Sequence, residues 1–296
     1  MIYKFIQKCG SQASRLHLNI KSLLNNIKAK IKSFLTYQTE YPLVQLAPRK
    51  AVMVLADSHL IPPTVIQLWA AKSFGKTHST AIEEFRSINT DISFLLFDDN
   101  ESNAYIDNTW GTHPIHEIYK SSRFGPLKAD IFRYCMLYEL GGYYFDINKG
   151  CSVPLRSLHL PSDRRLLSYE ASFCSVLPDL RTARCFQYPN RYLIQWGFGF
   201  APKDPILKRV IELICAYYPL FKGKEFQDPK SAILAFTGPG MFTKAVREVV
   251  QAEGRFDGAQ AGINFNGHGI PWMPGSEVRY HLSPPYVLAR NAVIVN

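Results

Sequence analysis

The chain has 296 residues, of which 47% are hydrophobic and 13% aromatic, and it carries a net charge of +10. This composition excludes a disordered, collagen-like or coiled-coil protein, and the length is close to the upper limit of about 250–300 residues for one hydrophobic core. Apolar runs such as Phe94 to Phe97 and Ala51 to Ala56 are far shorter than the roughly 20 residues of a membrane-spanning helix.

The positive charge is concentrated at the N-terminus. Residues 1–39 contain seven lysine or arginine residues and no acidic one, so they carry +7 and leave only +3 for the rest of the chain. Apolar residues such as Leu16, Ile20 and Leu23 recur there at helical spacing, with lysines on the other positions. The pattern leaves two alternatives: a helix on an anionic membrane surface, where each lysine contributes about 1 kcal/mol, or a helix packed on the domain. No Phe, Tyr or Trp is interleaved with the charges between Lys8 and Lys32 for base stacking, so we expect no nucleic-acid partner.

The domain organisation and location follow from the same pattern. We predict a basic amphipathic helical arm over residues 1–48 and one domain over residues 49–296. The N-terminus lacks the apolar stretch and cleavage site of a secretory signal, and the six cysteines show no zinc-type spacing. We therefore expect a cytoplasmic protein with reduced thiols, held peripherally at a membrane surface if the arm binds there.

Strands and helices alternate from Arg49 onward. Continuous apolar runs predict buried strands, polar residues at helical spacing predict helices, and glycines mark their ends. Helix 79–88 is expected to begin at Ser79 or Thr80 as N-cap, with Glu83 in a capping box. This alternation predicts an α/β fold with a mixed, mainly parallel sheet and helices on both faces. The expected elements are strand 51–56, a turn and strand over 61–69, helix 79–88, strand 92–97 ended by a turn or helix cap at Asp98 and Asp99, helix 127–140 ended by Gly141 and Gly142, and strand 143–147.

The residues with the clearest chemical signal lie between 128 and 148. Asp130 and Arg133 are three apart, so they share one face of the predicted helix. Asp146 stands at the end of the following strand, where ligands bind in open α/β sheets, and Asn148 is expected to point the same way. Carboxylate, guanidinium and amide groups that converge there can hold a diphosphate and a divalent cation.

This segment resembles the signature of the DXD-containing sugar transferases of the yeast initiating α-mannosyltransferase type, which share a core with the glucosylating domains of large clostridial toxins. Their pattern is a small residue and Asp, then Arg-Tyr, a short helix, Gly-Gly, an apolar strand with Tyr, and Asp-x-Asp. The chain has every element except the last Asp, which is Asn148. Segments 61–69, 89–99, 197–205 and 237–243 resemble other parts of these proteins, so the resemblance covers about residues 50 to 245.

The resemblance implies a GT-A fold, a Rossmann-like nucleotide-diphospho-sugar transferase core that uses a UDP- or GDP-hexose and Mn²⁺ or Mg²⁺. By position, Trp69 is expected to stack on the base, and Asp130 and Arg133 to hold the donor sugar and orient the diphosphate. Tyr144 is expected to contact ribose or phosphate, beside Gly142. The catalytic residues implied are Asp130, Arg133 and Asp146, and the metal ligands are Asp146, Asn148 and His281.

Asn148 departs from the family pattern. An amide oxygen can bind Mg²⁺ or Ca²⁺ but lacks a carboxylate's charge, so the affinity for the cation should fall. Three alternatives follow: a working enzyme with weaker metal dependence, a site compensated by another group, or a degenerate transferase that binds nucleotide sugar without turnover.

The function predicted is transfer of a hexose, with retention of configuration and metal assistance, to a hydroxyl of a glycan, lipid-linked sugar or protein. Trp196 and Trp272 are candidates for an acceptor groove, with the core as the alternative. His268 and the turn Gly238-Pro-Gly240 are weaker site candidates. An effector-type protein glycosyltransferase, the degenerate binding protein, and a peripheral membrane scaffold are the other functions considered.

Overall fold

The computed structural model describes residues 43–52, 58–276 and 286–296. Most of the predicted arm, most of the predicted strand 51–56, and His281 lie outside these residues. The described end of the arm is strand β1 (Leu43–Gln45), which pairs antiparallel with β3 (Ser73–Gly75), so paired structure begins before residue 49. No helix within the described ranges is long and apolar enough to cross a membrane.

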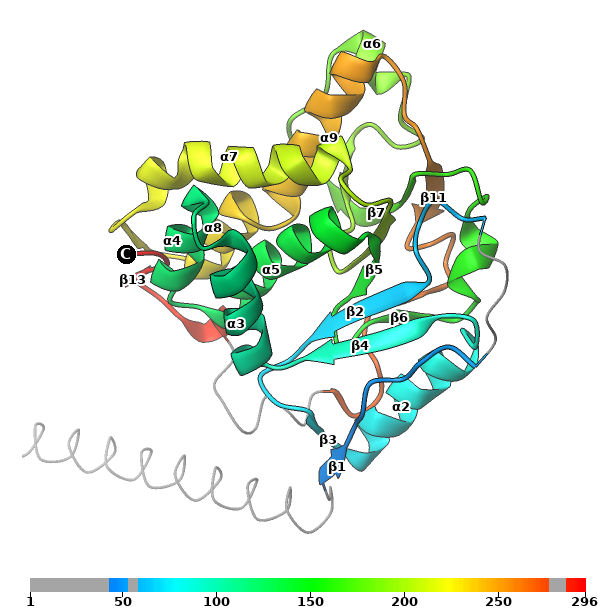
Figure 1. Cartoon of the computed structure of the whole chain (residues 1–296). Coiled ribbons are helices and arrows are strands. Elements are labelled where there is room, and N and C mark those ends of the chain that lie inside the picture. The colour runs from blue at the N-terminus through cyan, green and yellow to red at the C-terminus, as the bar shows by residue number, and fades with distance from the viewer. Residues whose placement is uncertain (1–42, 53–57, 277–285) are drawn as a thin grey trace, which may run out of the picture.

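A seven-stranded sheet forms the centre of the molecule (Figure 1), in the order β11-β7-β9-β5-β2-β4 with β8 paired to β7. Strands β4, β2, β5, β7 and β11 run in one direction, while β9 and β8 run the opposite way. The prediction of a mixed, mainly parallel sheet is therefore confirmed. The strands are β2 (Thr64–Leu68), β4 (Ser93–Phe97), β5 (Gly142–Phe145), β7 (Arg165–Phe173), β8 (Arg191–Leu193), β9 (Gly197–Phe200) and β11 (Ala259–Ile263). Short two-stranded pairs join β6 (Gly150–Cys151) to β12 (Gly269–Ile270) and β10 (Glu225–Phe226) to β13 (Ala292–Val293).

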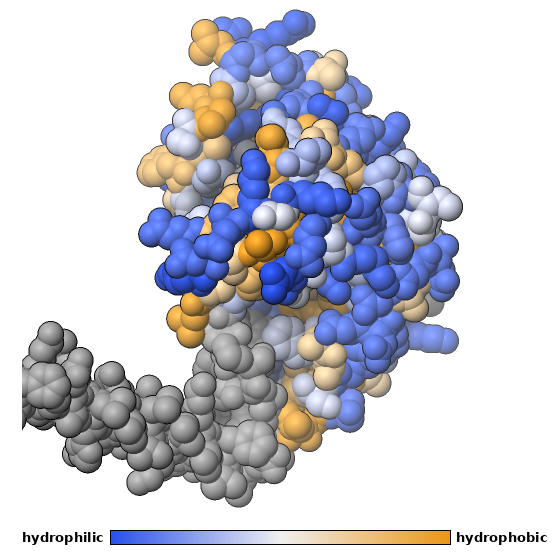
Figure 2. Space-filling model, turned by 90° about the vertical axis from the view of Figure 1, so that its left-hand side faces the viewer, coloured by the Kyte–Doolittle hydropathy of each residue, from blue (hydrophilic) through white to orange (hydrophobic). Residues whose placement is uncertain are grey.

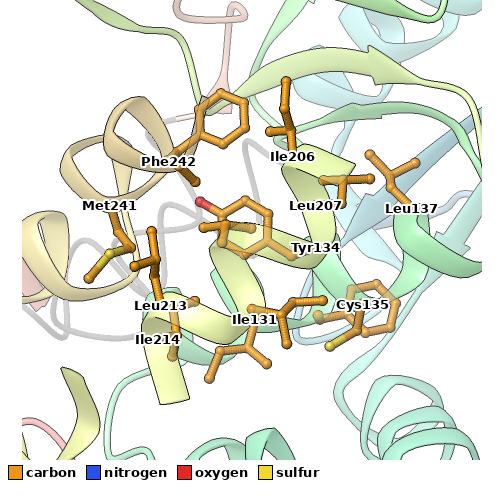
Figure 3. Close-up of a cluster of buried hydrophobic side chains, with 14 of the residues drawn as sticks. Ile131, Tyr134, Cys135, Leu137, Ile206, Leu207, Leu213, Ile214, Met241 and Phe242 are labelled. Carbon is orange, nitrogen blue, oxygen red and sulfur yellow. The ribbon is translucent and has the colours of Figure 1, made fainter. Parts of the chain in front are cut away.

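Helices cover both faces of the sheet, as predicted (Figure 1). On one face a large apolar cluster joins the sheet to most of the helices, and on the other a smaller cluster packs against α2. Figure 3 shows how tightly three helices of the larger cluster interlock: Tyr134 of α5 lies among side chains of α7 and α9. The helices are α2 (Lys76–Ser87), α3 (Asp99–Trp110), α4 (Pro114–Ser121), α5 (Gly125–Leu140), α6 (Leu180–Ala183), α7 (Pro205–Phe221), α8 (Pro229–Phe236) and α9 (Pro239–Glu253), with 3-10 turns at Leu155–Leu158 and Tyr286–Leu288.

The outer surface of the helical layer is mainly hydrophilic. Figure 2 shows this on the side where α4 and α8 lie, with only small, separate hydrophobic patches. Helix α7 explains the division, because its buried residues, such as Ile206, Val210 and Ile214, follow helical spacing and leave the polar positions outside. The helices therefore seal the core on this side.

Two helix starts test the predicted caps. The Asp98 side chain accepts a hydrogen bond from the Glu101 backbone, and Glu101 reciprocates, which is a complete capping box that starts α3. The cap predicted at Ser79 or Thr80 is wrong, because α2 already begins at Lys76 after Gly75. Glu83 instead forms an ion pair with Arg86 at 3.0 Å.

Candidate active site

A cavity of about 1320 Å³ opens beside the carboxyl end of β5, and Asp130, Arg133 and Asp146 line it. Helix α5 supplies the first two residues and the end of β5 supplies the third. This is the edge where parallel strands present ligand-binding groups. The volume exceeds the range of about 300–1,000 Å³ typical of small-molecule sites, so the cavity has room for more than one ligand group.

Arg133 is the centre of the polar network. Its Nη2 lies 3.2 Å from Asp130 Oδ1 and 3.1 Å from Asp146 Oδ1, although these carboxylates are 16 positions apart in sequence. Its Nη1 donates to the Gln195 carbonyl at 2.8 Å, and the guanidinium lies 4.3 Å above the Tyr144 ring. Burial disfavours the charged form, but Asp146, Tyr144 and Asp130 outweigh this and raise the pKa of Arg133, so it remains a cation.

Asp130 is held on both of its oxygens. Gln195 Nε2 donates to Oδ1 and Thr237 Oγ1 donates to Oδ2, each at 2.8 Å. The Tyr134 hydroxyl closes the network, accepting from Gln195 and donating to the Thr237 carbonyl at 2.8 Å. Burial raises the pKa of Asp130, while Arg133 and the two side-chain donors act against that shift. Asp130 is thus a rigid partner that fixes Arg133 in place.

Asp146 is the more accessible carboxylate, with 31% of its side chain exposed. Its Oδ1 accepts from the Tyr144 hydroxyl at 3.1 Å as well as from Arg133. Its backbone N–H donates to the Trp196 carbonyl at 2.8 Å, which anchors the strand end. Asp146 therefore presents negative charge to the cavity beside a fixed cation.

The structure adds a second wall that was only partly foreseen from the sequence. Glu170 on β7 and Lys149 in the turn after β5 line the same cavity, together with Trp196. Strand register explains their approach, because Leu166 lies level with Tyr143 across β9, so Glu170 lies level with the residues that follow β5. Neither Glu170 nor Lys149 belongs to a recognisable motif, so no local signal identified them. Trp196 was a candidate on its aromatic character alone.

The other predicted site residues occupy different places. Trp69 follows β2 at the same sheet edge but packs against the core cluster on the α2 side, whereas Tyr144 and the α5 residues lie on the opposite face. Gly142 is buried with φ +97°, and a Cβ there would lie 2.5 Å from the Thr64 carbonyl oxygen. The structure thus gives Gly142 a conformational reason to be glycine.

Asn148 does not continue the strand. Strand β5 ends at Phe145, and a turn closed by the Lys149 N–H to the Asp146 carbonyl, 2.9 Å, follows it. Asp146 lines the cavity, whereas Asn148 is 5% exposed and is not among the residues that line it. The prediction that the two side chains point the same way fails because the period-two pattern stops at the turn.

A cation site made by the protein alone is not found among the residues the structure describes, which contain no group of three or more acidic, histidine or cysteine ligands. Asp130 and Asp146 both line the cavity, but both oxygens of Asp130 are engaged by side-chain donors, so Asp146 is the carboxylate more open to a cation. One carboxylate suits Mg²⁺ held largely by donor phosphates and water. His268 is exposed, and the predicted ligand His281 lies outside the described residues.

The cavity continues toward α9 and the segment 172–179. Pro239 and Gly240 of the predicted turn line it, as do Lys244 and Arg247 farther along the helix. Two lining residues here are unusually exposed apolar side chains: Val176 and Leu177 are 70% and 65% exposed. Leu180, three residues farther along the chain, is 83% exposed.

Comparisons with known proteins identify related sequences and a related family model. Residues 75–166 match the family model described as the glycosyltransferase sugar-binding region containing DXD motif. The chain is 27% identical over 168 residues to the initiation-specific alpha-1,6-mannosyltransferase of Schizosaccharomyces pombe, covering 53% of this chain and 40% of that protein. It is 28% identical over 211 residues to the protein of the same name from Candida albicans, covering 65% and 54%. Inositol phosphoceramide mannosyltransferase 2 of S. pombe is 30% identical over 105 residues, covering 35% of this chain and 30% of that protein.

The chain thus spans about half or less of the length of these relatives. Among solved structures, PaToxG Glycosyltransferase aligns with a TM-score of 0.38 and 14% identity, over 88% of this chain and 92% of that one.

Proposed function

We propose that this chain is a glycosyltransferase of the DXD-containing type whose family model matches residues 75–166, and that it transfers a hexose from a nucleotide-diphosphate sugar to a hydroxyl acceptor. The observation that carries the proposal is the cluster of Asp130, Arg133 and Asp146 at the carboxyl end of β5. The cluster lines a cavity that is large enough for donor and acceptor. The names of the relatives favour mannose as the sugar.

The chemistry follows from charge. As the glycosidic bond breaks, negative charge grows on the departing diphosphate, and a fixed cation beside it lowers the barrier. Arg133 is suited to this role, because Asp130, the Gln195 carbonyl and Tyr144 hold its guanidinium before the donor arrives. Asp146, one face of which is open, is placed to bind hydroxyl groups of the donor. We propose that the anomeric configuration is retained, which proton NMR of the first product formed will test.

We further propose that a divalent cation binds together with the donor. Asp146 would hold it, and the cation would neutralise charge on the diphosphate when bound. Since one protein carboxylate is too little for tight binding of the free ion, we expect Mn²⁺ alone to change the melting temperature little, and Mn²⁺ with nucleotide to change it much more.

The acceptor is proposed to be presented at a membrane surface. The exposed side chains of Val176 and Leu177, which line the cavity, and of nearby Leu180 are suited to shallow insertion among lipids. Co-sedimentation with vesicles of anionic phospholipid tests this, and a variant with Leu177→Asp and Leu180→Asp should bind them more weakly. Equal binding of both proteins would assign the membrane contact, if any, elsewhere.

The first experiment is a thermal-shift screen with UDP, GDP and their common sugars, with and without Mn²⁺, followed by measurement of nucleoside diphosphate release. A ligand at a hundredfold excess over its dissociation constant stabilises the folded state by about 2.7 kcal/mol, which is readily seen. A shift without turnover would favour the degenerate binding protein. Absence of any shift with every nucleotide would contradict the proposed function.

A further inference from the structure

The second wall of the cavity has the composition of a sugar-binding surface. Lys149 Nζ lies 5.8 Å from the ring centroid of Trp196 and 5.4 Å from that of Trp272, and it also donates to the Pro271 carbonyl. Trp272 is 46% exposed, which is unusual for a side chain of its size. An ammonium group thus lies close to two indole rings, of which Trp196 lines the cavity and Trp272 directly follows the lining residue Pro271.

Glu170 completes this wall. It stands on β7, where Glu170, Ser172 and Cys174 alternate along the chain and all line the cavity. The Trp196 side chain hydrogen-bonds to Glu170, and Lys149 is its charged neighbour. Burial raises the pKa of this carboxyl, and the two partners act in the opposite direction. The wall therefore holds a partly desolvated acceptor of hydrogen bonds next to a donor.

The dipeptide Gln195–Trp196 separates the two walls. The Gln195 side chain reaches Asp130 at 2.8 Å, while the Trp196 side chain reaches Glu170. Their carbonyls bind Arg133 and the backbone of Asp146 respectively, each at 2.8 Å. One short segment between β8 and β9 thus fixes two polar clusters on different sides of the same cavity.

We propose that Glu170, Lys149, Trp196 and Trp272 form the subsite for a hexose ring of the acceptor. A sugar ring offers C–H groups on its face, which pack on an indole, and hydroxyl groups on its edge, which pair with a carboxylate and an ammonium. In the proposed function the cluster at Arg133 binds the donor diphosphate, and this subsite belongs to another part of the same cavity lining. That the bound hexose is the acceptor rests on the proposed function, whereas binding of a hexose to this subsite can be measured without turnover.

The binding test uses the whole chain and the methyl α-glycosides of mannose, glucose and galactose. Saturable change in tryptophan fluorescence is expected with at least one glycoside. The dissociation constant should rise about tenfold or more in Glu170→Gln, since a hydrogen bond to a charged group is lost. Trp272→Ala should weaken binding and Trp272→Phe should restore part of it. The matched control, Glu84→Gln on the exposed side of α2, should bind like the wild type. No saturable change with any of the three glycosides would overturn the proposal.

The kinetic test separates this inference from the proposed function. With the donor found in the thermal screen, Glu170→Gln and Trp272→Ala should raise the KM for the glycoside acceptor about tenfold. Nucleotide binding and donor hydrolysis in the absence of acceptor should stay within about twofold of the wild type. Equal losses in hydrolysis and transfer would place these residues in the donor site and overturn the inference. A wild type that neither binds nucleotide nor hydrolyses a donor sugar would instead refute the proposed function, and the fluorescence result would still decide on the hexose subsite.

Discussion

Two buried arginines of this protein each face two carboxylates, but of the two only Arg133 lines the cavity beside β5. Arg165, with 1% of its side chain exposed, lies 2.9 Å from Asp204 and makes two contacts of 2.8 Å with Glu253. It joins the first residue of β7 to the N-cap of α7 and the last residue of α9. Arg133 has similar partners but lies beside Asp146, whose carboxylate is 31% exposed to a space of about 1320 Å³.

The difference teaches that a buried ion cluster by itself does not indicate a site. In the Arg165 cluster the guanidinium binds Asp204 and both oxygens of Glu253 and ties three elements together, so its effect is structural, although Glu253 is 30% exposed. In the Arg133 cluster the guanidinium and Asp146 line a space that can hold a ligand. A cavity beside the charges, rather than exposure of a carboxylate, distinguishes this candidate site from an internal tie.

The largest effect is expected from breaking the structural cluster. Arg165→Met should lower the free energy of unfolding by about 3–5 kcal/mol, because Asp204 is left buried without its cation. Urea unfolding monitored by circular dichroism measures this loss. The double variant Arg165→Met with Asp204→Asn should regain part of it. Loss of activity per folded molecule in these variants would contradict the division between the clusters.

Asp146→Asn should reduce activity strongly while leaving the stability of the fold nearly unchanged. We expect activity to fall by about 10²- to 10³-fold, the range found when one group that holds charge in the transition state is removed. The fold should be little affected, because this side chain is partly exposed. Release of nucleoside diphosphate measures the change, with Glu139→Gln, on the same helix as Arg133, as control. Activity within a few-fold of wild type would remove Asp146 from the site.

The dependence of the unfolding free energy on pH below 7 tests the ion pair between Arg165 and Glu253. The hydrogen bond from Arg165 lowers the pKa of Glu253 from its ordinary value of 4.5. A folded-state pKa below the unfolded one gives stability that is present above about pH 4.5 and is lost as the pH falls through the folded value. Burial raises the pKa of Asp204, which has the opposite effect. Since Asp204 is common to both proteins, the difference between wild type and Glu253→Gln in urea unfolding from pH 7 to 3 should shrink as the pH falls. A difference that stays constant would show that Glu253 does not titrate within the cluster.

The smallest effect is expected from a third arginine with two carboxylates. Arg209 lies 2.7 Å from Glu248 and 3.3 Å from Glu212, but its side chain is 41% exposed. Solvent screens such pairs, so Arg209→Gln should cost about 0.2–1 kcal/mol in unfolding free energy. A loss comparable to that of Arg165→Met would mean that the number of partners, rather than burial, sets the strength of these clusters.

Much of the local structure could be predicted from the sequence. The helix that carries Asp130 and Arg133, its end at Gly141, and the strand that leads to Asp146 all follow from short-range patterns, and so does the cap at Asp98. Two local predictions were wrong, one on where a helix begins and one on how far a strand pattern extends. Helix α2 starts at Lys76 rather than at a serine or threonine cap, and the turn after Asp146 ends the strand alternation that Asn148 was expected to continue.

The sequence by itself determined the DXD-type segment, the α/β class and the grouping of Asp130, Arg133 and Asp146. Only the tertiary structure decided that Glu170 and Lys149 face the same cavity, that Trp69 lies on the other side of the sheet, and that Arg165 makes an internal tie rather than a site. The physical reason is that spacing along one helix or strand fixes which side chains share its face, whereas meetings between distant segments depend on strand order and register. Here β9, inserted antiparallel between β5 and β7, sets that register and brings the two walls of the cavity together.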